Sequence, residues 1–203
     1  MKKQIFLYAA LLLTFYACES ADIGKRLPQE TVELSPDAGE SVDLGLSVMW
    51  ADRNLDGYYA WGEIESKIRF SEDNYEAPFE ITASSFNNIS GSKYDAARMN
   101  WGGKWRMPTY KEYMEFVKKC SFKWTGREYE VTGPSGKKIS LPSSDDIIYH
   151  REGTTYWTAS ADQGEWMAPL NLTILSDITP QSGSAGPDFG WRGGYIRPVC
   201  DKK

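Results

Sequence analysis

Apolar and polar residues alternate from residue 42 to residue 50, which is the period of a strand with one buried face. Gly-Pro-Ser-Gly at 133–136 is typical of a turn and predicts a hairpin. The polar segments 64–92 and 176–188 are predicted to be loops. Similar alternation or short aromatic runs predict further strands at 58–61, 122–124, 128–132, 138–141, 156–160, 166–174 and 194–200.

Two segments carry helix signals instead. Residues 93–101 are followed by Gly102 and Gly103, which favour the end of a short helix. Thr109 and Glu112 have the spacing of a capping box, which predicts that a second helix begins there. Two short helices among many short strands predict an α+β fold with mostly antiparallel strands. The apolar residues expected on the inner face of the second helix are Tyr113, Phe116 and Val117.

The N-terminus has the layout of a secretory signal peptide. Two lysines precede an apolar run at 5–16, which is too short to span a membrane as a helix. Cys18 follows the small residue Ala17, which predicts a lipoprotein signal at 1–17 and lipidation of Cys18. The alternative is an ordinary signal peptide with Cys18 as a free thiol, a group that exported chains tend to avoid. Residues 18–40 are predicted to be a flexible tether and 41–203 a single domain.

Charge narrows the set of partners. Removal of residues 1–17, which carry two lysines and no acid, changes the formal net charge from −5 to −7. An acidic chain without basic clusters argues against nucleic acid and against anionic membrane surfaces as partners. Membrane contact is therefore expected through acyl chains on Cys18 alone.

The remaining cysteines are Cys120 and Cys200. An even pair in an exported chain predicts a disulfide, which would close a loop of about 80 residues and contribute at most about 4 kcal/mol. The alternative is two buried free thiols.

Few residues suggest catalysis or metal binding. His150 is the single histidine, so no zinc site built on two histidines can form, and no nucleophile elbow accompanies it. Asp145 and Asp146 are the nearest approach to a calcium-binding cluster and are interpreted as a solvated pair. The sequence therefore predicts no catalytic residue, metal or cofactor.

Five motifs occur in order along the domain. They are Val-Asp-Leu-Gly-Leu-Ser-Val-Met-Trp-Ala at 42–51, Tyr-Ala-Trp-Gly-Glu at 59–63, the segment 95–109 with Asn-Trp-Gly-Gly-Lys-Trp-Arg-Met-Pro-Thr, Tyr-Trp-Thr-Ala-Ser at 156–160, and Ile-Arg-Pro-Val-Cys at 196–200. Together they resemble the Fibrobacter succinogenes major paralogous domain of Bacteroidetes lipoproteins over roughly residues 41–200. That family is similar to the C-type-lectin-like superfamily.

The resemblance implies a C-type-lectin-like fold whose termini lie close together. C-type lectins join their first helix region to their last strand by a disulfide, which is a precedent for a bond between Cys120 and Cys200. The resemblance also implies an outer-membrane lipoprotein, facing the cell surface or the periplasm, with acyl chains such as palmitate on Cys18.

A binding surface is expected in the C-terminal part, at 157–192, where variable proteins of this superfamily carry their ligand face. Aromatic surface combined with charge is typical of recognition patches. The alternative is that the tryptophans belong to the core. The predicted function is a non-catalytic module that binds a glycan or a protein. A structural or adhesive subunit and an enzyme of the formylglycine-generating type, which requires free thiols, are the alternatives. The candidate ligand-binding residues are Trp166, Asp188, Trp191 and Arg192.

Overall fold

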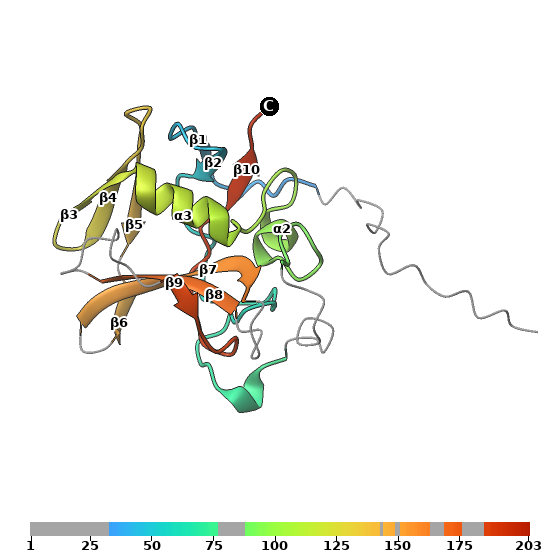
Figure 1. Ribbon diagram of the computed structural model, residues 1–203. Helices are drawn as coiled ribbons and strands as arrows, with labels where there is room; N and C mark the ends of the chain where they lie inside the picture. The colour runs from blue at the N-terminus through green and yellow to red at the C-terminus, as the bar shows by residue number, and fades with distance from the viewer. Residues whose placement is uncertain (1–32, 77–87, 143, 149–150, 163–168, 176–184) are drawn as a thin grey trace, which may run out of the picture. The chain divides into compact units, whose positions relative to one another are not determined.

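The computed structural model describes residues 33–76, 88–142, 144–148, 151–162, 169–175 and 185–203. Within them the fold is α+β, with short helices and small antiparallel sheets, as the sequence predicts (Figure 1). The helices are η1 (Glu72–Asn74), α2 (Ala96–Trp101) and α3 (Tyr110–Lys119). The strands are β1 (Ser41–Val42), β2 (Val48–Ala51), β3 (Ser121–Trp124), β4 (Glu128–Thr132), β5 (Lys138–Pro142), β6 (Ser144–Ile148), β7 (Arg151–Ala161), β8 (Pro169–Leu175), β9 (Ala185–Pro187) and β10 (Val199–Asp201).

The strands form three sheets in which every pair of neighbours is antiparallel. Their orders are β1-β2-β10, β3-β4-β5 and β6-β7-β8-β9. The first sheet joins the start of the domain to its end, because β1 and β10 both pair with β2. The second sheet is a meander whose β4–β5 turn contains Gly136 with a φ of +80°, as the predicted hairpin requires.

Helix α3 begins and ends where its sequence signals place it. The Thr109 hydroxyl accepts a hydrogen bond from the Glu112 amide, and the Glu112 carboxylate accepts one from the Thr109 amide at 2.7 Å. These two bonds satisfy amides that a helix start leaves free. The predicted inner face is buried, and it packs against β7 and β8. Tyr113, Phe116 and Val117 thereby join one of the two core clusters.

The sheet β1-β2-β10 separates the two core clusters. Successive side chains of a strand point to opposite faces. Val48 and Trp50 accordingly belong to the cluster that contains α3. Met49 and Ala51 face the second cluster, which contains Trp101. Both faces of β2 are thus covered.

This alternation explains why the predicted disulfide is wrong. Cys120 and Cys200 are both free thiols and both buried. Cys120 is the C-cap of α3 and packs with Val199 in the cluster on one side of the sheet. Cys200 follows Val199 in β10, so its side chain points to the opposite side, into the other cluster. A bond between the two sulfurs would require β10 to shift by one residue, which would exchange the side chains that β10 presents to the two core clusters.

Several predicted strands differ in extent. The segment 42–50 is not one strand but the hairpin of β1 and β2, and its turn contains Gly45 with a φ of +82°. Leu44 and Leu46 are buried in that turn, so the alternation predicts burial correctly without predicting the strand. At 58–61 the structure has a single bridge from Tyr59 to Gly194. The last strand is predicted at 194–200, but it contains only residues 199–201. It begins after Pro198, which has no backbone N–H to donate to a neighbouring strand.

The remaining differences concern segments predicted to be irregular. Residues 185–187 of the predicted loop 176–188 form β9, which pairs with β8. The domain also begins before residue 41. The Ser35 amide donates to the Trp101 carbonyl at 2.8 Å, and the Glu40 amide donates to Asp52 at 2.8 Å. The last part of the predicted tether is therefore a strap on the domain.

Candidate functional site

The segment that follows β9 presents an exposed pair of aromatic rings. Phe189 is 60% exposed, and its ring stacks on that of Trp191 with a centroid distance of 5.7 Å and an interplanar angle of 20°. Trp191 is partly exposed, so it does not belong to either core cluster. Large apolar side chains at a surface indicate a binding site when they form a contiguous patch.

A charged pair completes this surface. The Arg192 guanidinium lies over both rings, 5.4 Å from the Phe189 centroid and 5.6 Å from the Trp191 centroid. Its Nη1 lies 3.0 Å from Oδ1 of Asp188. We call Asp188, Phe189, Trp191 and Arg192 the aromatic patch.

Asp188 is held from the protein side. Its Oδ2 accepts a hydrogen bond from the side-chain amide of Asn171 on β8 at 3.0 Å. Its Oδ1 accepts one from the backbone amide of Phe189 at 2.8 Å. The Asp188 side chain is 20% exposed, whereas that of Arg192 is 47% exposed. The carboxylate therefore orients the guanidinium, and the guanidinium is the more accessible partner.

Three glycines fasten the segment to the domain. A Cβ at Gly193 would lie 2.6 Å from the Phe70 ring, and one at Gly194 would lie 2.8 Å from Nε1 of Trp157. A Cβ at Gly190 would collide with the hydroxyl of Tyr75. At each position an aromatic side chain packs so close to the glycine backbone that a residue with a Cβ would clash with it.

Hydrogen bonds reinforce these contacts. The Trp61 amide donates to the Gly190 carbonyl at 2.8 Å, and Tyr59 and Gly194 exchange two backbone bonds. The Tyr75 hydroxyl donates to the Trp61 carbonyl at 2.8 Å. Burial raises the pKa of Tyr75, so this donor stays neutral at physiological pH.

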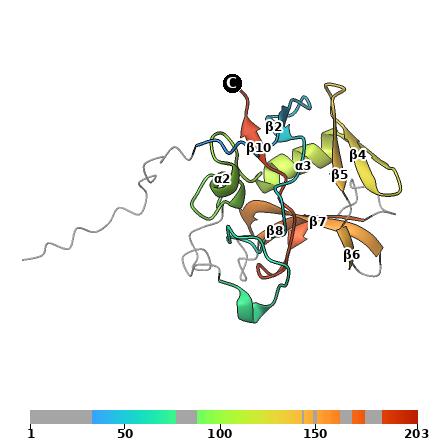
Figure 2. The same cartoon turned by 180° about the vertical axis from the view of Figure 1, so that it is seen from behind.

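The aromatic patch lies far from the ends of the domain. In Figures 1 and 2 the segment after β9 lies in the lower half of both views, just above η1, whereas β10 and the C-terminus are at the top. The described chain also enters in the upper half, before β1. The segment that carries the patch therefore lies away from both the entry point and the C-terminus.

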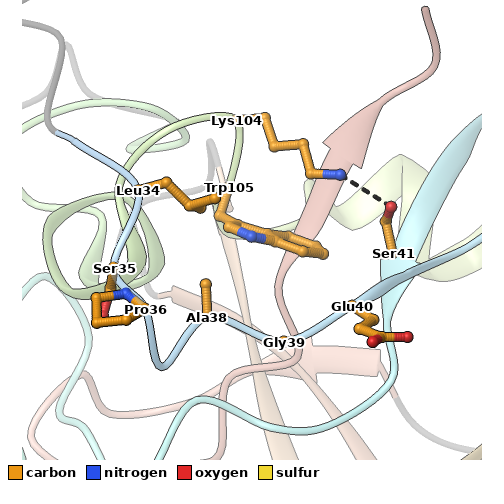
Figure 3. Close-up of a pocket in the computed structure, with 9 residues that line it drawn as sticks. All are labelled: Leu34, Ser35, Pro36, Ala38, Gly39, Glu40, Ser41, Lys104 and Trp105. Carbon is orange, nitrogen blue, oxygen red and sulfur yellow. Dashed lines mark hydrogen bonds between the residues drawn. The ribbon is translucent and has the colours of Figure 1, made fainter.

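A hollow of about 560 Å³ lies where the strap 34–41 crosses Trp105 (Figure 3). Trp105 is only 1% exposed, and the Lys104 ammonium donates to the Ser41 hydroxyl at 2.8 Å across the hollow. Because the strap residues 34–41 form one wall of the hollow and Lys104 is bound to Ser41, we interpret the hollow as the place where the strap packs on the domain.

Two buried charged side chains, Arg197 and Asp95, form hydrogen bonds that connect segments of the domain. Arg197 is 1% exposed and donates to Asn54 and to the carbonyls of Ala51 and Ser140. Asp95 is fully buried and accepts bonds from three backbone amides.

Neither a metal site nor a membrane span is found in the parts of the chain that the structure describes. No three His, Cys, Asp or Glu side chains there are grouped to hold a metal ion. No described helix is long and apolar enough to cross a membrane.

The structure brings three of the four predicted ligand-binding residues together: Asp188, Trp191 and Arg192. Trp166, Cys18 and His150 lie outside the described residues, and the Asp145 and Asp146 side chains are likewise outside the description. Sequence reasoning missed Phe189 and Asn171. The signal for Asn171 was a polar residue between two leucines in an apolar strand, and the signal for Phe189 was an aromatic residue between loop-forming Asp and Gly.

Comparisons of the chain with models of protein families, with curated proteins and with solved structures find no match. The family resemblance described above therefore stays a prediction from sequence motifs.

Proposed function

We propose that this chain is an exported lipoprotein whose folded domain is a non-catalytic module that binds glycans through the aromatic patch. The observation that carries the proposal is the stacked, exposed pair Phe189 and Trp191, held in place by three glycine contacts. Aromatic faces carry partial negative charge and attract the C–H groups of a sugar ring. A rigid platform also loses little entropy when a ligand binds.

The size of the patch favours a glycan over a protein. A stable protein interface buries about 800 Å² on each partner. Two aromatic side chains offer about 150–250 Å² each even when fully covered. Such a surface matches one or two sugar rings better than the face of a folded protein.

The location of the patch fits a lipid anchor on Cys18. In both views the described chain begins, at residue 33, in the upper half, whereas the segment that carries the patch lies in the lower half. The signal-peptide layout of residues 1–17 supports the anchor, and the net charge of −5 supports acyl chains rather than basic side chains as the membrane contact.

The non-catalytic part of the proposal depends on the two thiols. A formylglycine-generating type of enzyme needs reactive cysteines at an open site. Burial raises the pKa of Cys120 to about 11 and also raises the pKa of Cys200, so both are neutral, weakly nucleophilic thiols at pH 7. They also lie in different core clusters, so they are poorly placed to act together.

We extend the proposal to the fold, which we assign to the C-type-lectin-like class. The first and last strands of the domain share one sheet, as that class requires of its termini. The assignment rests on this pairing together with the five ordered sequence motifs.

A glycan array probed with the whole chain tests the proposal. We expect Trp191→Ala to lower affinity about 30-fold for the glycans bound by the wild type, which corresponds to about 2 kcal/mol for an aromatic hot spot. Trp124→Ala is the matched control, because Trp124 is also partly exposed and contacts Tyr129 with centroids 5.1 Å apart, but it lies in β3. Equal binding by wild type and Trp191→Ala would show that the aromatic patch is not the glycan-binding site. Stable self-association at micromolar concentration without glycan binding would favour the structural subunit instead.

A further inference from the structure

We infer that the glycan carries an anionic group, a carboxylate or a sulfate ester, and that Arg192 binds it. The inference rests on the proposed function and names the chemical class of its ligand. A platform that serves only neutral sugars needs aromatic rings and neutral hydrogen-bonding groups. The aromatic patch instead places a guanidinium over the rings, at 5.4 and 5.6 Å from their centroids.

The ion pair with Asp188 leaves Arg192 able to bind a second anion. A guanidinium carries five N–H donors in a planar fork, and the contact to Asp188 is made through Nη1. The carboxylate is turned toward the protein, where Asn171 and the Phe189 amide bind it. The arginine side chain, at 47% exposed, is the accessible side of the pair. An anion on the ligand can therefore use remaining donors without displacing Asp188.

Asp188 acts as a positioning residue in this arrangement. It fixes the guanidinium over the rings, which reduces the rotamer freedom that a long arginine side chain would otherwise lose on binding. Arginine rather than lysine is significant, because a planar fork matches a carboxylate or sulfate with two parallel hydrogen bonds.

The net charge of the chain makes this contact specific. At −5 the protein does not attract polyanions in general, so an acidic glycan must be recognised by a local cation. The inference thus predicts selectivity for an acidic sugar held against the rings, and it does not predict binding to any polyanion.

The experiment uses an array of matched pairs: uronate glycans with their methyl esters, and sulfated glycans with their desulfated forms. The whole chain is measured as wild type, Arg192→Gln, Arg192→Lys and Trp191→Ala, with thermal unfolding to verify that each variant is folded. We expect the wild type to prefer the acidic member at least tenfold. Arg192→Gln should abolish the preference, and Arg192→Lys, which keeps the charge but lacks the fork, should retain only part of it. Preference confined to the uronate pairs or to the sulfate pairs identifies the anion.

The chain offers a matched control in Arg53→Gln. Arg53 lies over the Trp101 ring at 5.3 Å and contacts Asp56 at 3.3 Å, which repeats the contacts of Arg192. Trp101 is buried, however, so this arginine is not part of an open platform. Arg53→Gln should keep the full acidic preference.

The outcomes separate this inference from the proposed function. If Trp191→Ala loses binding while wild type and Arg192→Gln bind acidic and neutral members equally well, the glycan-binding patch stands and the anionic ligand is refuted. If the wild type binds no glycan of either kind, both are refuted.

Discussion

Asp95 should make this protein more stable at pH 5 than at pH 7. Its carboxylate is fully buried and accepts hydrogen bonds from the amides of Gly91 at 2.7 Å, Met107 at 2.8 Å and Arg98 at 3.0 Å. It thereby caps α2 and ties that helix to the segment before α3. Two effects oppose each other here, since burial favours the neutral acid and the amide donors favour the carboxylate.

Burial dominates and raises the pKa of Asp95 from 3.8 to about 6, against the lowering effect of the amides. A carboxyl whose pKa is higher in the folded state takes up a proton more readily when folded, so stability increases as the pH falls. The difference between 3.8 and about 6 corresponds to about 3 kcal/mol over the whole titration. About 1 kcal/mol of this falls between pH 7 and pH 5 by the same linkage relation.

Urea unfolding followed by tryptophan fluorescence at pH 5, 6 and 7 measures this difference for the wild type and for Asp95→Asn. The asparagine cannot ionise, so its stability should lack the increase toward pH 5. Carboxylates such as Glu130, whose pKa is lowered by the hydrogen bond that it accepts from Lys138, lose stabilisation only at lower pH and are present in both proteins. If wild type and Asp95→Asn change equally with pH, or if the wild type is less stable at pH 5, the amide donors outweigh burial and the reasoning is refuted.

Two further predictions concern the core and the aromatic patch. In the whole chain carrying Cys18→Ser, unfolded without reductant, a thiol titration should find two thiols, because Cys120 and Cys200 are free; finding none would establish the disulfide. Gly193→Ala should destabilise the domain by about 1–3 kcal/mol and weaken glycan binding, because its Cβ would lie 2.6 Å from the Phe70 ring. Gly126→Ala is the control: its Cβ meets open space but its φ of +94° strains alanine, so it should lower stability without a clash near the patch and leave binding unchanged. Unchanged affinity in Gly193→Ala would show that the glycine contacts do not hold the patch in place.

Local signals in the sequence predict the helices well and the strand boundaries poorly. The capping box at Thr109 and Glu112 determines the start of α3 because both partners lie within one turn. The end of the first strand and the start of the second cannot be predicted in this way. Residues 42–50 alternate throughout, yet the alternation continues through a turn in which Leu44 and Leu46 are buried by α3 and the second sheet. Long-range packing produces that pattern, and periodicity alone cannot distinguish it from a strand.

The disulfide fails for a related reason. Counting cysteines identifies a plausible pair, but the side of a sheet to which a residue points depends on the register of its strand. Val199 pairs with Trp50 and Cys200 with Met49, which sends the two neighbouring side chains into different core clusters. The pattern of residues predicts the strand, but it does not predict the register of that strand or the side of the sheet on which α3 packs. The separation of Cys120 from Cys200 could therefore not be predicted.

The aromatic patch was predictable in composition and not in construction. Charge and aromatic residues close together at 188–192 are visible in the sequence, whereas the partners that hold them come from distant segments. Tyr75 and Phe70 seat Gly190 and Gly193, and Asn171 binds Asp188. These contacts hold the backbone that carries the two exposed rings. The backbone of the stacked pair is held by glycine contacts, and the Asp188 carboxylate already orients the Arg192 guanidinium. The patch therefore needs little rearrangement to accept a ligand. This preorganisation is the physical reason for proposing that the surface binds one.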